Sequence, residues 1–362
     1  MFKGSLIHSD YKDLLNKENI YNRKFKEEQI QPSSMDLTLS EECYEIKASI
    51  LASESNVRNV LKRVIIKKID LKKGYIFKKN KIYLVKINEK LNLPKNIFGK
   101  CNPKSSTGRL DIFCRTILDY SDEYEKIPLN YRGEIFLEVT SRSFDIKFQR
   151  GNSLNQMRLV FLNHQYVTDK KLEKYHNQKA IIYDNKSQKI KANILNGLKI
   201  SVDLANDGRV KCFIAKKNAP VLDFNKINCH EIKKFWNFKY AKNKELLIEP
   251  GNFYILKSKE KVLIPSNMAG EMIPYDTGIG DFRVHYAGFF DPGFGNSKGS
   301  YAVLEVKTNE VPFILQDNQN IAKIKYERLN KKSKMLYGAG IKSNYQNQEL
   351  KLSKHFLNNK NK

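Results

Sequence analysis

The chain has 362 residues, which is enough for about two domains that each bury a core. It carries 65 Lys and Arg against 39 Asp and Glu, and the formal net charge of +26 attracts phosphates of any kind. Apart from the C-terminal tail, the lysines are spread along the sequence, whereas a nucleic-acid groove favours a basic stripe. An AT-rich genome explains the lysine excess equally well, so we expect neither nucleic acid nor a membrane as partner.

The cysteine pattern argues against a disulfide framework and against a structural zinc site. The cysteines are odd in number and widely spaced, and no Cys-x-x-Cys pair occurs. The first fifteen residues lack the apolar core of a signal peptide, and no apolar run approaches the ~20 residues of a membrane span. We therefore expect a soluble, cytoplasmic protein. The cysteines are Cys43, Cys101, Cys114, Cys212 and Cys229.

Taken in chain order, the predicted elements are mostly short strands. Helical periodicity is found mainly in residues 9–29 and 229–238. Runs rich in Ile, Val, Tyr and Phe alternate with Gly, Pro, Asn and Asp turns, which is typical of β-sandwiches and barrels. The pattern predicts an all-β protein with a few short helices. The strand-like runs are residues 81–87, 134–141, 144–149, 253–258 and 301–308.

The sequence contains an internal repeat. Residues 83–103 align without a gap with residues 254–274, and eight of these twenty-one positions are identical. Three collinear matches indicate a tandem duplication in which one fold is used twice. The other two matches pair "SMDL" (34–37) with "SVDL" (201–204), and "FLEV" (136–139) with "VLEV" (303–306).

The repeat divides the chain into four parts. The connector is distinguished by a Lys- and Asn-rich composition, and the tail is polar. We predict a first repeat over residues 1–163, a connector over 164–196, a second repeat over 197–330 and a C-terminal tail over 331–362.

One polar stretch, "NPKSSTGRL" (102–110), has the composition of an anion-binding loop. Hydroxyl and backbone N–H groups donate hydrogen bonds, glycine permits close approach of the backbone, and arginine offers a planar fork that fits phosphate oxygens. A polar hairpin turn has the same composition, so the stretch alone leaves both interpretations open.

Six motifs follow one another through both repeats and the tail. They are "IQPSSMDLTL" (30–39), "PKSSTGRLDIF" (103–113), "YRGEIFLEV" (131–139), "GNSLNQM" (151–157), "HYAGFFDPGFG" (285–295) and "YGAGIKSNYQNQ" (337–348). In this order they resemble the motifs of the dCTP deaminase family, which belongs to the trimeric dUTPase-like superfamily. The chain is similar to the long, tandemly duplicated bacterial form of that family.

The resemblance implies a fold, an assembly and a reaction. Members of the family are all-β, jelly-roll-like subunits that form trimers with active sites at subunit contacts. They convert dCTP and water into dUTP and ammonia, and some also cleave the triphosphate. They need no zinc, and Mg²⁺ accompanies the triphosphate. The resemblance therefore predicts two tandem dUTPase-like jelly-roll or barrel repeats, a trimeric or pseudo-hexameric homo-oligomer, and dCTP as the substrate.

Hydrolytic deamination needs a base that takes a proton from water and an acid that returns one to the leaving amine. Zinc deaminases activate the water with a metal held by a His-x-Glu and Pro-Cys-x-x-Cys signature, and neither element occurs here. By similarity to the family, the catalytic carboxylates are Glu138 in "FLEV" and Glu305 in "VLEV". Because Leu and Val flank each glutamate, we expect its carboxyl group to be partly desolvated within an apolar strand. A glutamate on the solvent face of an alternating strand would show the same sequence pattern.

The same similarity assigns substrate-binding residues. In the family, the segment that matches "KSSTGR" binds the triphosphate, and Gln156 matches a glutamine near the phosphates. Tyr337 and Gln348 match tail positions that fold over the nucleotide, where a lid would exclude water. The residues assigned in the first segment are Lys104, Ser105, Ser106 and Arg109.

The two repeats depart from the family pattern in opposite ways. The second has "PYDTGIGDF" (274–282) where the phosphate-binding segment would stand, and the first has Pro128 where the second keeps Asp291. In dUTPases the corresponding aspartate activates water and contacts the sugar. We hypothesise a composite site, within or between chains, and the alternative is two unequal sites of which one is decayed or regulatory. The second-repeat residues of the composite site are Arg283, His285, Asp291, Val303, Leu304 and Glu305, and a core histidine fits the pattern of His285 equally well.

The leading interpretation is a dCTP deaminase. A dUTP diphosphatase, or a bifunctional deaminase and diphosphatase, stays open because Asp291 is present. The alternative from another class is a catalytically silent nucleotide- or nucleic-acid-binding module that uses the charge of +26.

Overall fold

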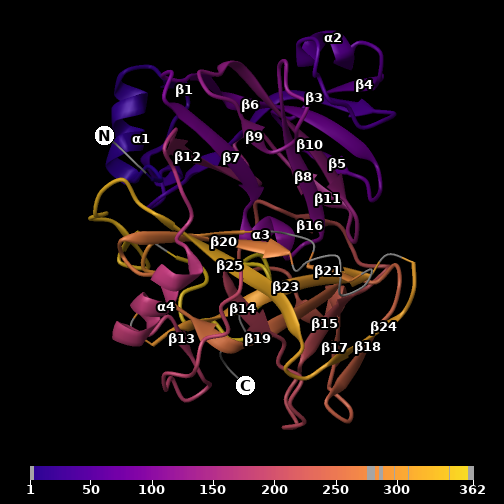
Figure 1. Cartoon of the computed structure of the whole chain (residues 1–362). Helices are drawn as coiled ribbons and strands as arrows, with labels where there is room; N and C mark the ends of the chain where they lie inside the picture. The colour runs from indigo at the N-terminus through magenta and orange to yellow at the C-terminus, as the bar shows by residue number, and fades with distance from the viewer. Residues whose placement is uncertain are drawn as a thin grey trace. The chain divides into compact units, whose positions relative to one another are not determined.

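The structure, a computed structural model, describes residues 4–274, 282–284, 288–296, 298–308, 310–341 and 343–357. It is mostly β, as the sequence predicts, and the longest helix in these residues has ten residues (Figure 1). Within the part of the chain that is described, no helix is long and apolar enough to cross a bilayer.

The chain forms two compact units, and the first comprises Met1–His164, Lys217–Glu231 and Ser353–Lys362. Its elements in chain order are α1 (His8–Asn16), β1 (Ile20–Tyr21), the 3-10 helix η1 (Glu27–Gln29), β2 (Met35–Leu37), β3 (Leu39–Ile46), α2 (Val57–Leu61), β4 (Ile65–Asp70), β5 (Tyr75–Phe77), β6 (Ile82–Asn92), β7 (Ile97–Pro103), α3 (Ser105–Gly108), β8 (Ile112–Leu118), β9 (Lys126–Ile127), β10 (Arg132–Ser141), β11 (Ile146–Phe148), β12 (Asn155–Phe161) and β16 (Leu222–Asp223). One sheet has the strand order β4-β3-β6-β10-β8 with β1 beside β6, a second has the order β2-β12-β7-β9, and a third has the order β16-β11-β5.

The second unit comprises Gln165–Lys216 and Ile232–Leu352. Its elements are α4 (Asp169–Gln178), β13 (Ile182–Tyr183), β14 (Leu198–Ser201), β15 (Cys212–Ala215), α5 (Ile232–Phe235), β17 (Trp236–Lys239), β18 (Glu245–Ile248), β19 (Tyr254–Val262), β20 (Met268–Pro274), β21 (Phe282–Val284), β22 (Phe289–Phe290), β23 (Ser300–Thr308), β24 (Phe313–Gln316), β25 (Asn320–Arg328), β26 (Leu336–Tyr337) and β27 (Gly340–Ile341). One sheet has the order β17-β15-β19-β23-β21 with β13 beside β19, and another has the order β14-β25-β20-β22; the two-stranded pairs are β18-β24 and β26-β27.

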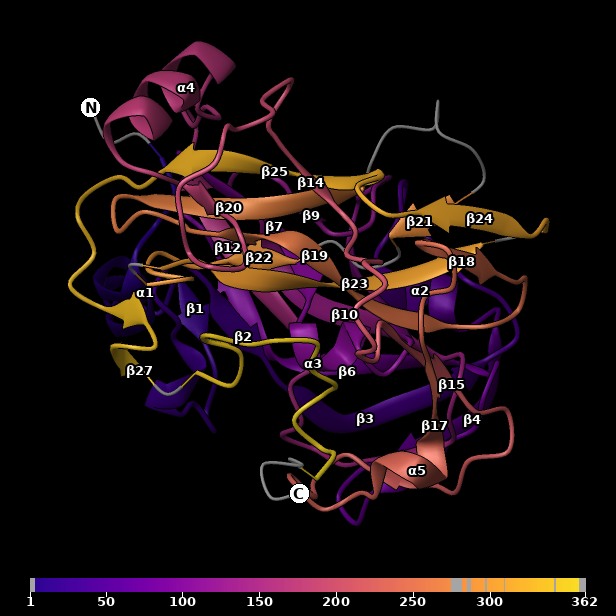
Figure 2. The same cartoon turned by 90° about the horizontal axis from the view of Figure 1, so that it is seen from below.

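The core of the second unit lies between its two larger sheets, which form adjacent layers in Figure 2. Leu198 on β14 and Ile324 on β25 belong to the same buried cluster as Leu256 on β19 and Leu304 on β23. Because side chains alternate across a strand, the residues next to Leu304 point to the outer face of their sheet. This alternation decides which way Glu305 points.

The internal repeat is reproduced as structure. The aligned segments form β6 and β7 in one unit and β19 and β20 in the other. One of the eight identities pairs Gly99 on β7 with Gly270 on β20. A Cβ atom at Gly99 would lie 2.8 Å from the Arg158 carbonyl oxygen, and one at Gly270 would lie 2.8 Å from Ile264 Cδ1. A Cβ atom would therefore crowd a backbone oxygen at Gly99 and a side-chain methyl group at Gly270, so glycine is demanded more strictly at Gly99.

The predicted helices are shorter than their patterns suggested. In residues 9–29, α1 ends at Asn16, and Glu18 adopts a φ of 53° that a continuing helix would not tolerate. In residues 229–238, only the four residues of α5 are helical before β17 begins. Conversely, the connector forms α4, whose sequence "DKKLEKYHNQ" buries only Leu172 and His176. So few apolar positions give a weak helical signal.

Candidate active site

Glu138 lies within β10 and is only 3% exposed. It points to the same face of the strand as Phe136, because residues two apart share a face. Phe136 packs against Val57 and Leu61 of α2, so this face of the sheet is covered by the segment of residues 47–61. Glu138 is therefore buried, but on the face that a simple strand pattern assigns to solvent.

An arginine and a serine hold the Glu138 carboxylate. Arg115 lies opposite Glu138 on the neighbouring strand β8, and its Nη2 donates a hydrogen bond of 2.7 Å to Glu138 Oε1. Ser49 Oγ donates to Glu138 Oε2 and accepts from Arg115 Nη2 at 2.7 Å. The guanidinium of Arg115 also stacks over the Tyr124 ring, 3.7 Å from its centroid. These contacts replace the hydrogen bonds to water that the carboxylate loses on burial.

Sequence reasoning missed Arg115 and Ser49. The available signal for Arg115 was a single cation in the apolar run "IFCRTIL" (112–118). A charged residue in such a run requires a buried partner. Ser49 lies in an irregular loop and gives no signal of its own.

A second acidic residue, Glu125, lies near this group. Its carboxylate accepts hydrogen bonds from Thr116 Oγ1 at 3.1 Å and from Asn155 Nδ2 at 3.2 Å. Burial raises the pKa of Glu125 to about 7, although these hydrogen bonds and the charge of Arg115 act in the opposite direction. Glu125 is thus a carboxyl group that titrates near neutral pH. It follows Tyr124, which stacks on Arg115.

The predicted phosphate-binding segment forms the short helix α3, which connects β7 of one sheet to β8 of the other. The Lys104 carbonyl accepts hydrogen bonds from Thr107 N at 2.8 Å and Gly108 N at 3.0 Å, and this begins the helical turn. Ser106 and Arg109 are buried, and Lys104 and Ser105 are half-buried.

Lys104 and Gln156 are brought together around an aspartate. Lys104 Nζ forms an ion pair with Asp36 Oδ2. Asp36 on β2 and Asn102 on β7 are the two cross-strand neighbours of Gln156 on β12. The aspartate comes from "SMDL", one of the repeated motifs. Of the predicted residues, the structure therefore groups the "KSSTGR" segment and Gln156 in the first unit.

In the second unit, the carboxylate of the repeated motif has a similar position. Glu305 on β23 is 5% exposed, and its neighbours Leu304 and Val306 point into the core. Glu305 therefore points to the outer face, next to Ile255 on β19. Val303 shares that face and is also buried. The two repeats thus bury equivalent glutamates on equivalent faces.

The C-terminal tail covers the segment that begins at Asp291, which is itself buried. Tyr337 N donates to the Pro292 carbonyl at 2.8 Å, and the Tyr337 ring lies 5.7 Å from the Phe294 ring. Gln346, which the sequence did not single out, accepts from Gly295 N at 3.0 Å and donates to the Gly293 carbonyl at 3.1 Å.

Gln348, the second predicted tail residue, is fixed at the start of β23. Its Nε2 donates to the Tyr301 carbonyl at 2.8 Å, and its backbone N donates to Ser300 Oγ at 3.2 Å. Gln348 also lines a polar cavity of about 320 Å³ in the second unit, together with Lys261 and Glu349. The tail is thus part of a polar site in this unit.

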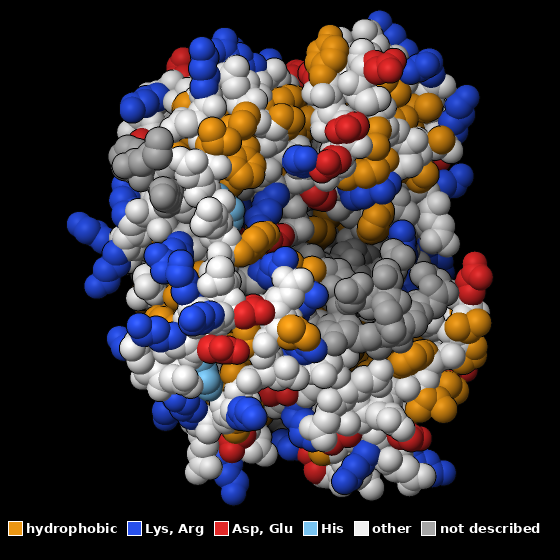
Figure 3. Space-filling model, viewed as in Figure 1, with side chains coloured by type: hydrophobic (Ala, Val, Ile, Leu, Met, Phe, Trp, Pro, Cys, Tyr) orange, Lys and Arg blue, Asp and Glu red, His pale blue; other side chains and the backbone are white. Residues whose placement is uncertain are grey.

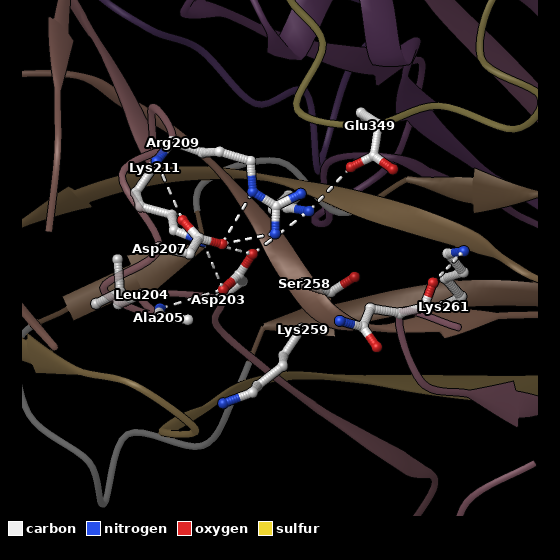
Figure 4. Close-up of polar contacts among 12 residues, drawn as sticks. Asp203, Leu204, Ala205, Asp207, Arg209, Lys211, Ser258, Lys259, Lys261 and Glu349 are labelled. Atoms are coloured by element: carbon white, nitrogen blue, oxygen red, sulfur yellow. Dashed lines mark hydrogen bonds and ion pairs between the residues drawn. The ribbon is translucent and has the colours of Figure 1, made fainter. Parts of the chain in front are cut away.

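An ion-pair network joins the repeated "SVDL" motif to the tail (Figure 4). Lys211, whose side chain is 2% exposed, donates to Asp203 Oδ1 at 3.0 Å and to Asp207 Oδ2 at 2.9 Å. Lys257 Nζ lies 3.4 Å from Asp203 Oδ2 and 3.0 Å from Glu349 Oε2. Burial by itself raises the pKa of Asp203, but the hydrogen bonds and charges of the lysines lower it below its ordinary value.

The backbone of Arg283 pairs with Lys307 on β23. His285 lies outside the described residues, as do residues 275–281 of the altered segment. Among the described residues, no group of three His, Cys, Asp or Glu side chains is placed to hold a metal ion.

Comparisons with known proteins identify the family. The model of the 2'-deoxycytidine 5'-triphosphate deaminase (DCD) N-terminal domain matches residues 2–163, and the model of the C-terminal domain of the same enzyme matches residues 168–356. A search of curated proteins gave no match. Among solved structures, the chain is similar to 2'-deoxycytidine 5'-triphosphate deaminase from Agrobacterium tumefaciens, with 35% sequence identity and a TM-score of 0.88, covering 94% of this chain and 100% of that chain. The chain therefore belongs to the 2'-deoxycytidine 5'-triphosphate deaminase family.

Proposed function

We propose that the protein hydrolyses dCTP to dUTP and ammonia. The observation that carries this proposal is a buried glutamate in each repeat, Glu138 and Glu305, on equivalent strands of a chain in the dCTP deaminase family. In the first repeat the carboxylate already has the ion pair and hydrogen bond that fix its orientation. The similar solved structure is that of a 2'-deoxycytidine 5'-triphosphate deaminase from Agrobacterium tumefaciens.

The proposed chemistry is general base and then general acid catalysis by a carboxylate. The glutamate takes a proton from water while the water oxygen bonds to C4 of cytosine. The same glutamate then returns that proton to the exocyclic nitrogen, the C4–N bond breaks, and ammonia leaves. The second water proton, still on the oxygen bound to C4, moves to ring nitrogen N3 as the C4 carbonyl forms. The glutamate ends ionised, as it began. Such proton transfer contributes roughly 10² to 10⁴ in rate.

The triphosphate is proposed to bind the segment around α3. Lys104 and Arg109 supply positive charge, and the Ser105 and Ser106 hydroxyls supply hydrogen bonds to phosphate oxygens. Gln156 on β12 lies directly opposite Asn102 on the neighbouring strand β7 and adds an amide donor. The proposed triphosphate site therefore consists of residues of the first repeat alone.

We also propose that both repeats contribute to turnover. The support is in the sequence: only the first repeat retains the "KSSTGR" segment, and only the second retains Asp291 with "DPGFG". The tail residues Tyr337 and Gln348 lie on the second-repeat segment, which supports a role for them beside Asp291. Alanine at Arg109 and alanine at Glu305 should each abolish dCTP turnover. Full activity in either single variant would refute the requirement for both repeats.

Mg²⁺ is proposed to enter with the nucleotide. This ion prefers phosphate oxygens and water, with one or two protein carboxylates. A protein ligand for Mg²⁺ is present, since the carboxylate oxygen Asp36 Oδ1 is buried without a hydrogen-bond partner among the described residues. The ion would neutralise phosphate charge at the Lys104 end of the site. A trimeric or pseudo-hexameric homo-oligomer is proposed on the family resemblance, and light scattering on the purified protein measures it.

Cleavage of the triphosphate is a second candidate activity. The observation that favours it is Asp291, which is buried under the tail in the second repeat, whereas the first repeat has Pro128. Incubation with dCTP, followed by identification of dUTP or dUMP, separates deamination from a bifunctional reaction. Nucleic-acid binding is not favoured, because Figure 3 shows Lys and Arg side chains scattered over the visible face with Asp and Glu among them.

The direct test of the proposed reaction is ammonia release from cytosine nucleotides, measured with and without Mg²⁺. We expect dCTP to yield equal amounts of ammonia and dUTP. The matched variants are Glu138→Gln and Glu305→Gln, which keep the volume of the side chain and remove its basic oxygen. Steeply salt-dependent binding to DNA or RNA without ammonia release would instead favour the non-catalytic module.

A further inference from the structure

A groove of about 580 Å³, here called the α4 groove, lies in the second unit between α4 and the end of β25. Val167, which precedes α4, donates from its backbone N to the Tyr326 carbonyl at 2.7 Å, so α4 begins beside β25. Figure 2 shows α4 next to this strand, at the edge of the layer that β25 forms with β14 and β20. The groove has the size of a small-molecule pocket, and it shares no residue with the sites described above.

The lining of the α4 groove is basic. Lys171 and Lys174 lie three residues apart on α4 and therefore share a face of the helix. Arg328 at the end of β25 also lines the groove, as do Lys331 and Lys332, which follow it. Five of the eleven lining residues are thus Lys or Arg, against 65 of the 362 residues in the chain, and no described lining residue is Asp or Glu. The lysine-rich composition alone does not account for this excess.

The carboxylates of α4 do not neutralise this charge. Asp169 accepts hydrogen bonds from the backbone N of Asn196 and of Gly197, at 2.5 and 2.9 Å. Glu173 lies two residues from one groove lysine and one residue from the other, and residues at these spacings do not face each other on a helix. Four of the basic residues form no ion pair with any residue that the structure describes: Lys171, Lys174, Arg328 and Lys332.

The tandem repeat provides an internal comparison, because α1 occupies the equivalent place in the first unit. There, Leu6 N donates to the Leu159 carbonyl at 2.9 Å, and α1 begins two residues later. Leu159 pairs with Gly99 just as Tyr326 pairs with Gly270, its equivalent in the repeat. The hydrogen bond before α1 is therefore the counterpart of the one before α4, and the two helices can be compared position by position.

This comparison shows that the fold does not require the positive charge. At the positions of Lys171 and Lys174, the first repeat has Asp10 and Asp13. The same framework thus carries negative charge at this place in one repeat and positive charge in the other. A role of the two lysines in binding is therefore favoured over a role in folding.

The chemistry of the α4 groove fits phosphate. A hollow lined by one sign of charge focuses the electrostatic field and concentrates counterions. Lysine binds phosphate as a compact charge, and arginine presents several N–H donors in one plane. The amides of Gln178 and Asn267 add neutral donors, and Tyr175 and Met268 add apolar surface. The cations surround one hollow, whereas a nucleic-acid backbone requires cations along a continuous track.

We propose that the α4 groove binds a small anion that carries several phosphate charges. Lys171, Lys174 and Arg328 supply the charged contacts to the phosphate oxygens. The groove lies outside the motifs that resemble the family, and it is independent of the α3 segment to which the triphosphate of dCTP is assigned. Free nucleotides and inorganic polyphosphates share the required chemistry.

The test measures binding of inorganic tripolyphosphate to the full chain by calorimetry. Lys171→Asp/Lys174→Asp introduces the residues that α1 has at the equivalent positions, so the helix should still fold. The matched control, Lys170→Asp/Lys186→Asp, changes the net charge equally at two exposed residues that do not line the groove. Loss of two charge-assisted contacts predicts a Kd for the groove raised at least ~100-fold in the first variant. The control should stay close to the wild type.

The number of bound anions separates this inference from the proposed function, because the α3 segment is also proposed to bind phosphate. The wild type should bind two tripolyphosphates per chain, and Lys171→Asp/Lys174→Asp should bind one with unchanged ammonia release from dCTP. If the α3 assignment fails, the wild type should bind one and the variant none, which still supports the groove. Equal number and affinity of sites in the wild type and in Lys171→Asp/Lys174→Asp overturn the proposal.

The same variant identifies the source of the phosphates. Binding of ATP that is tighter than binding of tripolyphosphate, and that Lys171→Asp/Lys174→Asp abolishes, supports a nucleotide whose base contacts Tyr175. The reverse order of affinities supports an inorganic polyphosphate. A single-stranded oligonucleotide that binds the groove more tightly than either probe would identify a nucleic-acid site and overturn the proposal.

A measurement on the wild type covers the case in which the variant fails to fold. Reductive methylation labels accessible lysines, and mass spectrometry identifies the labelled positions. Tripolyphosphate should protect Lys171 and Lys174 while leaving Lys170 and Lys186 labelled. Equal labelling of Lys171 and Lys174 with and without tripolyphosphate contradicts the proposal.

Discussion

Arg115 and Glu138 face each other across strands β8 and β10, and their side chains form an ion pair with a donor–acceptor distance of 2.7 Å. Glu138 is nearly inaccessible, and the guanidinium is its positive partner. Removing that partner leaves a buried carboxylate without compensation, which typically costs 3–5 kcal/mol of stability. The ion pair therefore contributes both to the stability of the first unit and to the position of Glu138, the proposed base.

The first prediction concerns Arg115→Gln. We expect ammonia release to fall at least ~100-fold, because the carboxylate loses both its orientation and its countercharge. Arg115→Lys keeps the positive charge but loses the planar guanidinium with its several N–H donors, so its rate of ammonia release should be intermediate. Arg132→Gln, at an exposed position of β10, is the control. Wild-type activity in a folded Arg115→Gln variant would show that the ion pair has no role in turnover.

The second prediction concerns Ser49→Ala. The hydroxyl bridges Glu138 and Arg115, so its removal takes one hydrogen bond from each. A loss of about 1–2 kcal/mol corresponds to a rate lowered roughly 5- to 30-fold if the bridge acts in the transition state. The pH profile should keep its shape, since the titrating groups are unchanged. An unaltered kcat would restrict Ser49 to a structural role.

The burial of Glu138 illustrates how far the sequence could predict the site. The repeat of "FLEV" as "VLEV" identified two glutamates in equivalent strands, and both are buried. The predicted reason was wrong, since Leu137 and Val139 point to the other face of the strand. The cover comes from residues 47–61, which no local pattern connects to β10. Arg115 was missed for the same reason, because strand register is a long-range property.

The tail shows a second limit of sequence reasoning. Tyr337 and Gln348 were predicted to fold over a nucleotide, and in the structure both are hydrogen-bonded to other residues of the second unit. Their role toward substrate stays a prediction.

The third prediction is a pH dependence of stability that arises from Glu125. Its pKa of about 7 in the fold exceeds the ordinary value of 4.5, so the folded state retains the proton where the unfolded state releases it. The contribution of Glu125 to the free energy of unfolding is fully present below about pH 4.5. It is lost as the pH rises from 4.5 to about 7, and it is absent at higher pH.

Glu125→Gln mimics the protonated carboxyl. We expect this variant to be more stable than the wild type at pH 8, by on the order of 2 kcal/mol, and to lose that advantage near pH 4.5. Urea unfolding at the two pH values measures the difference. A constant difference between variant and wild type across this range would show that Glu125 does not titrate as described.

The fourth prediction concerns an acidic residue that both repeats retain, buried at Glu89 and half-buried at Glu260. Glu89 accepts hydrogen bonds from Thr38 N and Thr38 Oγ1, both at 2.9 Å, and from Gln29 Nε2 at 2.8 Å. Glu260, its counterpart in the alignment, accepts from Ser201 N at 2.9 Å and Ser201 Oγ at 2.5 Å. Glu89 therefore ties the connection between β2 and β3 to β6, and Glu260 ties the end of β14 to β19.

Glu89→Ala leaves several buried donors unsatisfied and should lower the free energy of unfolding by about 3 kcal/mol. Glu89→Gln retains one accepting oxygen and should cost less. Denaturant titration of both variants gives the two values, and dCTP turnover in the folded fraction should remain. A loss below about 1 kcal/mol in Glu89→Ala would mean that water replaces the carboxylate at little cost.

The central claim is that a buried glutamate makes water attack the cytosine ring. It is tested most directly by ammonia release from dCTP with the wild type and with the double variant Glu138→Gln/Glu305→Gln, both checked for folding and for tripolyphosphate binding. The account predicts one ammonia for each dUTP with the wild type, and no detectable ammonia from a double variant that still binds tripolyphosphate. Ammonia release from that folded double variant at a rate near the wild type would contradict the account.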